Sequence, residues 1–206
     1  MPLSFTQVPP NSTGNKMRTR TRVQGLDIVH EQAVYQGALP TYYFLADAVA
    51  FAANKHMISL YNATGSGALI SIKKLYLINL QLSSASGVAL RQNVIRFSSE
   101  HTGGTLITPT SCDSANGTLP TQITCRTGAT ITDVSILFPL TFSNDEVGTT
   151  QAFPSTQLLA GINWFPEGSE IQEVRLREGE GLTVKNITST TVGSFAYLFV
   201  VVIDEL

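Results

Sequence analysis

The sequence predicts an all-β protein, built as a two-sheet sandwich or a barrel. From residue 56 onward, apolar residues recur at every second position, which is the spacing of a half-buried strand. Short segments rich in Gly, Ser, Asn, Asp and Pro separate the apolar runs, and these residues favour turns. The 3.6-residue spacing of an amphipathic helix does not recur after residue 56, so few helices are expected.

Nine segments have the length and spacing of a strand. A shorter strand is also expected near Tyr42–Leu45, within the least regular stretch of the sequence. The nine segments are 56–61, 69–81, 87–97, 122–126, 130–142, 158–164, 171–177, 181–187 and 194–203.

A glycine-containing stretch, residues 62–67, raises the question of a phosphate-binding loop. A P-loop requires Lys and then Ser or Thr after its last Gly, and a dinucleotide fingerprint requires a third Gly before a helix. Here Gly67 is followed by Ala68 and then by a strand pattern. The evenly spaced apolar residues of that pattern are Ile70, Ile72, Tyr76, Ile78 and Leu80. We therefore predict a hairpin loop in which Gly65 and Gly67 adopt positive φ.

The last predicted strand is apolar on both faces. Phe195, Tyr197 and Phe199 fall on one face, and the residues between them are also apolar. In a two-sheet sandwich, one face of each sheet normally looks outward. The pattern therefore has two interpretations: the strand contributes to a subunit interface, with Phe195, Tyr197 and Phe199 as candidates, or the N-terminal region covers its second face.

The composition is unusually poor in charge. Charged residues make up 14% of the 206 residues, against about 25% in typical domains. Hydrophobic residues make up 43%, which is enough for a core. The net charge of −2 predicts no general attraction to nucleic acid or membrane. A surface with so few charges suggests that another subunit covers part of it, so a homo-oligomer is expected.

The charge is divided unevenly along the chain. Residues 1–26 contain four basic residues and no acidic one, which makes +4 and leaves −6 on residues 27–206. The segment is rich in Pro, Ser, Thr and Asn, so it predicts a flexible basic arm before a sandwich domain of residues 27–206. Three interpretations of the arm stay open: a solvated tail, an arm that orders on an acidic partner, and a nucleic-acid contact, for which four charges without interleaved aromatic residues form only a small footprint. The four basic residues are Lys16, Arg18, Arg20 and Arg22.

Targeting signals and cysteine usage predict synthesis in a reducing cytoplasm. Residues 1–14 lack the apolar segment of a signal peptide. The longest apolar run, residues 195–203, is far shorter than the ~20 residues of a membrane-spanning helix. We therefore expect Cys112 and Cys125 to be free thiols, with a disulfide between them as the alternative.

Residue types that carry out chemistry do not form a recognisable site. The acidic residues of 167–180 fit an ion-paired, solvated strand in which Glu173 shares a face with Arg175. Neither a nucleophile motif nor the spacing of a metal site is present, so we predict no catalytic residue, no metal and no cofactor. Trp164 has two interpretations: a ligand platform for sugar stacking, or a core residue at the edge of the sandwich.

Several stretches resemble structural proteins of tailed-bacteriophage virions. The resemblance covers roughly residues 50–203 and is strongest in "REGEGLTVK", residues 177–185, with "AANKHMISLYNATGSG" and "TVGSFAYLFVV" in support. It implies a jelly-roll fold and a non-enzymatic role, and the family contributes no catalytic residues.

With the resemblance included, the predicted fold is an antiparallel jelly-roll-like β-sandwich with an extended basic N-terminal arm. The predicted function is that of a capsid decoration (cement) protein, with a tail, baseplate or fibre module and a host carbohydrate-binding module as alternatives. The expected partners are further copies of the chain, with a trimer favoured, and the major capsid protein or other virion proteins. Neither a membrane nor nucleic acid is expected as a partner, and the expected location is the virion, after synthesis in the host cytoplasm.

Overall fold

The computed structural model describes residues 3–7, 16–24, 27–32, 39–79, 88–132, 134–144, 157–163, 173–188 and 194–205. The chain divides into two units, Met1–Ala38 and Leu39–Leu206. The predicted domain boundary after residue 26 falls inside the first unit. All regular elements of the described residues are strands, so the all-β prediction is confirmed.

The first unit contains a three-stranded antiparallel sheet. Its strands are β1 (Leu3–Gln7), β2 (Lys16–Gln24) and β3 (Asp27–Gln32), and β2 lies in the centre. No strand was predicted in this segment, because its residues are mostly polar.

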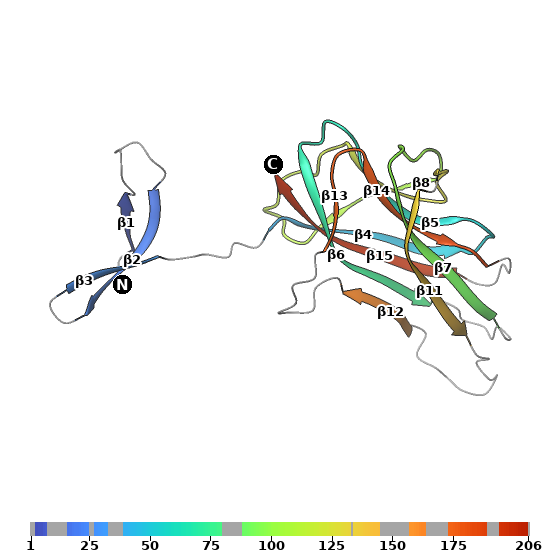
Figure 1. The fold of residues 1–206 in the computed structure, drawn as a ribbon, viewed down its shortest axis with the longest axis horizontal. Coiled ribbons are helices and arrows are strands. Elements are labelled where there is room, and N and C mark those ends of the chain that lie inside the picture. The colour runs from blue at the N-terminus through green and yellow to red at the C-terminus, as the bar shows by residue number, and fades with distance from the viewer. Residues whose placement is uncertain are drawn as a thin grey trace. The chain divides into compact units, whose positions relative to one another are not determined.

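The second unit consists of two antiparallel sheets (Figure 1). Each of the nine predicted segments overlaps one of its strands, and two short strands, β8 with three residues and β9 with two, were not predicted. The strands are β4 (Thr41–Ala50), β5 (His56–Asn62), β6 (Ala68–Asn79), β7 (Val88–Phe97), β8 (Thr105–Ile107), β9 (Thr110–Ser111), β10 (Ile123–Thr127), β11 (Ser135–Asn144), β12 (Gln157–Asn163), β13 (Val174–Leu176), β14 (Glu180–Asn186) and β15 (Ser194–Glu205).

The strand order shows how the chain pairs with itself. One sheet has the order β11-β7-β14-β5-β10-β8, and the other has the order β12-β6-β15-β4-β9 with β13 also paired to β6. Among the eight strands of seven or more residues in this unit, β7 pairs with β11, β6 with β12, β5 with β14 and β4 with β15. The first four long strands thus pair with the last four in reverse order, as in one long hairpin folded over into two layers.

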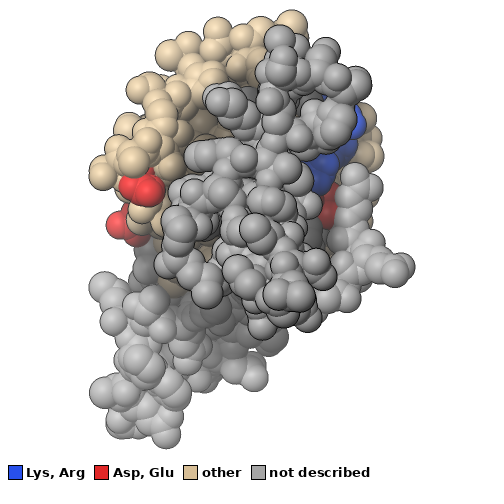
Figure 2. Space-filling model, turned by 90° about the vertical axis from the view of Figure 1, so that its left-hand side faces the viewer, with Lys and Arg blue, Asp and Glu red and all other residues tan. Residues whose placement is uncertain are grey.

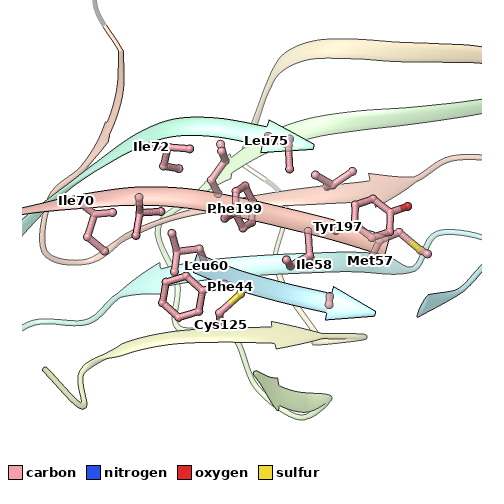
Figure 3. Close-up of a cluster of buried hydrophobic side chains, with 14 of the residues drawn as sticks. Phe44, Met57, Ile58, Leu60, Ile70, Ile72, Leu75, Cys125, Tyr197 and Phe199 are labelled. Carbon is pink, nitrogen blue, oxygen red and sulfur yellow. The ribbon is translucent and has the colours of Figure 1, made fainter. Parts of the chain in front are cut away.

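The core lies between the two sheets and draws large side chains from both (Figure 3). Period-two alternation explains it, because every second residue of a strand faces the other sheet. The largest fully buried side chains belong to Tyr197, Phe44, Phe97, Phe195, Phe199, Met57, Ile58, Leu60, Ile70, Ile72, Leu75 and Leu77.

Strand β6 departs from the even spacing that the sequence suggested. Ile70 and Ile72 are fully buried as expected, but Leu75 is buried in place of Tyr76. The register with β15 shifts between Val200, opposite Lys74, and Val201, opposite Ile72, so one residue of β6 is extra. A bulge of this kind exchanges the two faces of a strand from that point onward.

The glycine-containing loop at residues 62–67 is not a hairpin loop. Strand β5 before it belongs to one sheet and β6 after it to the other, so the loop connects the two layers. The conformational part of the prediction is confirmed, because Gly65 and Gly67 have φ values of 86° and 64°. Asn62 holds the connection in place: its buried amide nitrogen donates to the carbonyl oxygens of Ala68 (2.9 Å) and Leu176 (3.2 Å) in the other sheet.

Candidate functional site

The four basic residues of the predicted arm lie on the central strand β2 of the first unit. Lys16, Arg18, Arg20 and Arg22 occupy alternate positions of this strand. The register sets Arg18 opposite Phe5 and Arg20 opposite both Leu3 and Glu31. This period-two row was visible in the sequence, but the polar composition led us to expect an arm without a period.

The predicted interface residues are part of the core. Phe195, Tyr197 and Phe199 have no exposed surface within the single chain, and Figure 3 shows Tyr197 and Phe199 among the core side chains. A fully buried side chain has no surface to offer to a second subunit, so these three residues are reassigned from an interface to the core. The opposite face of β15 is also largely covered, since Ala196, Val200 and Val202 are buried as well.

Exposed apolar side chains gather instead at the start of β11, an edge strand of its sheet. Val134, Ile136 and Leu137 are 60%, 59% and 41% exposed. The register with β7 shifts between Ile136 and Phe138, and this bulge directs Phe138 against the core while its neighbours stay outside. Strand β11 contains no charged residue. Exposed apolar residues on an uncharged edge are typical of a contact surface.

Charged residues are also sparse on the described part of the face in Figure 2. In the view of Figure 2, the described surface is mostly uncharged, with small acidic and basic areas near its margins. On the face that Figure 2 shows, the low charge of the composition therefore extends to the described surface. A partner that covers such a surface has few charges to remove from water, so the desolvation cost of the contact is small.

Glu173 forms a partly buried ion cluster just before β13. Its side chain contacts the Lys73 ammonium, and its Oε1 accepts a hydrogen bond of 3.2 Å from Arg175 Nε. Burial by itself raises the pKa of Glu173, but the hydrogen bonds and charge of Lys73 together with Arg175 bring it below its ordinary value. The predicted pairing of Glu173 with Arg175 is confirmed, whereas the predicted solvation is wrong because Glu173 is only 6% exposed.

A buried histidine lies on the outer face of the β5–β10 sheet. His101 Nδ1 is 2.8 Å from Ser59 Oγ, and its Nε2 is 2.8 Å from Thr124 Oγ1. Ser59 Oγ donates to the Arg126 carbonyl oxygen at 3.3 Å, which assigns the imidazole hydrogen to Nδ1. Burial, and secondarily the charge of Arg126, lowers the pKa of His101 to about 4, so the ring is neutral near pH 7.

The Ser59–His101 pair resembles a nucleophile and its base, but its surroundings give it a structural role. A nucleophilic serine must face its substrate. Ser59 is fully buried, and its hydroxyl hydrogen is used by the Arg126 carbonyl group. The rings of Tyr61 and Phe97 lie 5.7 and 6.0 Å from the His101 ring and close the site from the side. The pair therefore anchors the segment around residue 101 to the sheet.

A pocket opens at the end of the sandwich where strand β4 begins. Its volume is about 280 Å³. Tyr42, Ala68, Leu119 and Ile203 are buried lining residues, while Gly117 is exposed. None of the lining residues is charged; they are Pro40, Tyr42, Ser66, Gly67, Ala68, Gly117, Thr118, Leu119, Pro120 and Ile203. No local pattern in the sequence indicates this pocket, because its walls come from four segments far apart in the chain.

The remaining sequence predictions concern cysteines, metals and Trp164. Cys112 is exposed, Cys125 is buried in the core, and both are free, as predicted. Trp164 lies outside the described residues. Among the described residues, no group of three His, Cys, Asp or Glu side chains is placed to hold a metal ion. The same part of the chain contains no helix that is long and apolar enough to cross a membrane.

Comparisons with known proteins yielded no match to a family model, a curated protein or a solved structure.

Proposed function

We propose that the chain is a structural protein of a tailed-bacteriophage virion, and that it decorates and stabilises the head. The observation that carries the proposal is the pairing of the eight long strands. Their reverse-order pairing in two layers, β4 with β15 through β7 with β11, supports a jelly-roll topology. Double-sheet jelly rolls recur in viral capsid domains, and the sequence resemblance points to the same class.

The proposed mechanism is adhesion. A decoration protein binds across neighbouring capsid subunits and so resists the pressure of the packaged DNA. A specific contact of this kind needs about 1,200–2,000 Å² of buried surface. The uncharged edge strand β11, with Val134, Ile136 and Leu137 exposed, supplies apolar surface for it. Repetition over many identical sites makes modest individual contacts effective.

The N-terminal unit supplies an electrostatic contact in this proposal. The four basic residues of β2 are matched by an excess of acidic residues elsewhere in the sequence, since residues 27–206 carry −6. A neighbouring copy or an acidic capsid surface is therefore a suitable partner for it. Exposed ion pairs contribute only about 0–1 kcal/mol each, so the contact adds orientation more than affinity.

Copy number in purified virions tests the role. Quantitative mass spectrometry, referenced to the major capsid protein, should find hundreds of copies per particle if the chain decorates the head. A few copies to a few tens would favour a tail, baseplate or fibre component. Absence from purified particles would overturn the virion proposal.

A further inference from the structure

The pocket at the β4 end of the sandwich has walls that are fixed before any ligand arrives. On one side, Gly67 N donates to Glu178 Oε1 at 2.8 Å, and this carboxylate also accepts from the Gly65 N–H group. These bonds lower the pKa of Glu178, so the carboxylate is ionised near pH 7 and holds the loop at residues 62–67 in one position. Asn62 ties the same loop to the second sheet.

The opposite wall, formed by residues 117–120, is held as firmly. Tyr42 donates its hydroxyl hydrogen to the Gly117 carbonyl oxygen at 2.5 Å. Asn116 Nδ2 donates to the Thr41 carbonyl oxygen at 3.3 Å and contacts Ser111 Oγ at 3.0 Å. The two walls are also joined to each other, because Ala63 N donates to the Gln122 carbonyl oxygen at 3.1 Å. Because the walls are already fixed, little conformational entropy is lost when the pocket binds a ligand.

The lining determines the class of ligand. With no Lys, Arg or His among the lining residues, a phosphate or carboxylate would lose its solvation without compensation. With no Asp or Glu, the same holds for a cation or an amine. The pocket offers hydroxyl and backbone groups at Ser66, Thr118 and Gly117, beside the aliphatic surfaces of Pro120 and Ile203. A ring with hydroxyl groups on its edge and C–H groups on its faces matches both kinds of surface.

From these observations we propose that the pocket binds one neutral sugar ring. Its volume of about 280 Å³ lies just below the ~300–1,000 Å³ of pockets that take drug-sized ligands, so it suits a single ring. The Gly117 carbonyl oxygen keeps one lone pair free for a sugar hydroxyl after accepting from Tyr42. This inference does not rest on the virion role, and it concerns a different part of the molecule from strand β11.

The test uses the full chain and uncharged methyl glycosides of glucose, galactose, mannose and N-acetylglucosamine as probes. Binding is followed by saturation-transfer NMR and by titration at millimolar concentrations. At least one glycoside should bind saturably, with a Kd in the millimolar range because a single ring makes few contacts. Inorganic phosphate and methylammonium serve as charged probes and should not bind at the pocket.

A matched pair of variants locates the binding. A Cβ at Gly117 would meet no atom within 4 Å, so Gly117→Trp can fold and fill the pocket. The control is Ala53→Trp, at an exposed position before β5, whereas the pocket lies beyond the end of that strand. Gly117→Trp should weaken binding at least ~10-fold, and Ala53→Trp should leave it unchanged. If Gly117→Trp does not fold, Thr118→Trp at the neighbouring exposed position replaces it.

Three results would overturn the proposal. The first is that none of the glycosides binds. The second is that binding persists unchanged in the folded pocket-filling variant. The third is that a charged probe binds and is lost in that variant, because the pocket would then accept a different chemical class. A negative sugar result leaves the copy-number test of the virion role unaffected, so the two proposals fail separately.

Discussion

The Gln92 side-chain amide donates a hydrogen bond of 2.7 Å to the Tyr197 hydroxyl inside the sandwich, and both side chains are fully buried. The bond joins β7 of one sheet to β15 of the other across the core. Burial raises the pKa of Tyr197 far above its ordinary value, so the phenol stays neutral at all accessible pH values. A polar contact inside an apolar layer fixes how the two sheets are aligned.

Removing the tyrosine hydroxyl should therefore destabilise the protein. Tyr197→Phe leaves the Gln92 amide without its acceptor, and a buried unpaired group costs about 1–3 kcal/mol. The double variant Gln92→Met with Tyr197→Phe should recover most of that loss, because both polar groups are then gone. Urea unfolding of the wild type and three variants measures the coupling. If the double variant loses as much stability as the two single variants together, the two side chains are not coupled and the bond contributes nothing to stability.

Acid should destabilise the protein through His101. Its folded-state pKa of about 4 lies below the ordinary value of 6.5, so the unfolded chain binds the proton more readily. The stability that neutral His101 contributes is complete above pH 6.5 and is lost as pH falls toward 4, with a slope of at most about 1.4 kcal/mol per pH unit. Urea midpoints measured between pH 4 and 7 test this.

His101→Gln is the matched variant for the acid prediction. Glutamine keeps a neutral polar side chain but does not titrate in this range, so its stability curve should be flatter between pH 4 and 6.5. An unchanged slope would assign the acid sensitivity to other groups.

A single methyl group at Gly181 should be costly. A Cβ there would lie 2.2 Å from Cζ of Phe97, which is fully buried and stacked with Tyr61 at 5.7 Å. Because the ring is fully buried, any shift that makes room for the methyl group must displace core neighbours, so Gly181→Ala should lower stability by about 1–3 kcal/mol. Gly117→Ala is the control, since its Cβ would meet nothing within 4 Å, and it should change stability by less than about 0.5 kcal/mol. Similar melting temperatures for both variants would contradict the predicted clash.

The two thiols should differ strongly in reactivity. Cys112 is exposed, whereas burial raises the pKa of Cys125 well above its ordinary value and removes it from solvent. A thiol reagent at neutral pH should label one cysteine rapidly in the native protein and the second only as the protein unfolds. Cys112→Ser should abolish the fast phase. Two fast phases in the wild type would show that the core around β10 opens readily.

A chain that begins at Leu39 should fold without the N-terminal unit, because both sheets and their core belong to the second unit. If the basic row on β2 contributes to attachment, this chain should bind virions that lack the protein more weakly and with less dependence on salt. The matched variant replaces Lys16, Arg18, Arg20 and Arg22 by Gln in the full chain. Binding equal to the wild type in both, at low and at high salt, would leave the row without a role in attachment.

The all-β class and the approximate positions of nine strands could be predicted from the sequence alone. Period-two alternation and turn residues are local signals, so they can be recognised without knowing which strands pair. The positive φ of Gly65 and Gly67 and the ionic contact between Glu173 and Arg175 were predicted for the same reason, because each depends on a few neighbouring residues.

Which surfaces are covered depends instead on how the two sheets pack together. The buried face of β6 changes at a bulge, and the position of this bulge depends on the register of β6 with β15. The alternation of apolar residues in the sequence does not show where the bulge lies. Phe195, Tyr197 and Phe199 became core residues because a second sheet lies over them. The pocket arose where Tyr42, Gly67 and Gly117 meet, and pairing across two layers sets that meeting. Such relationships depend on long-range register, and a single sequence does not encode that register in any local pattern.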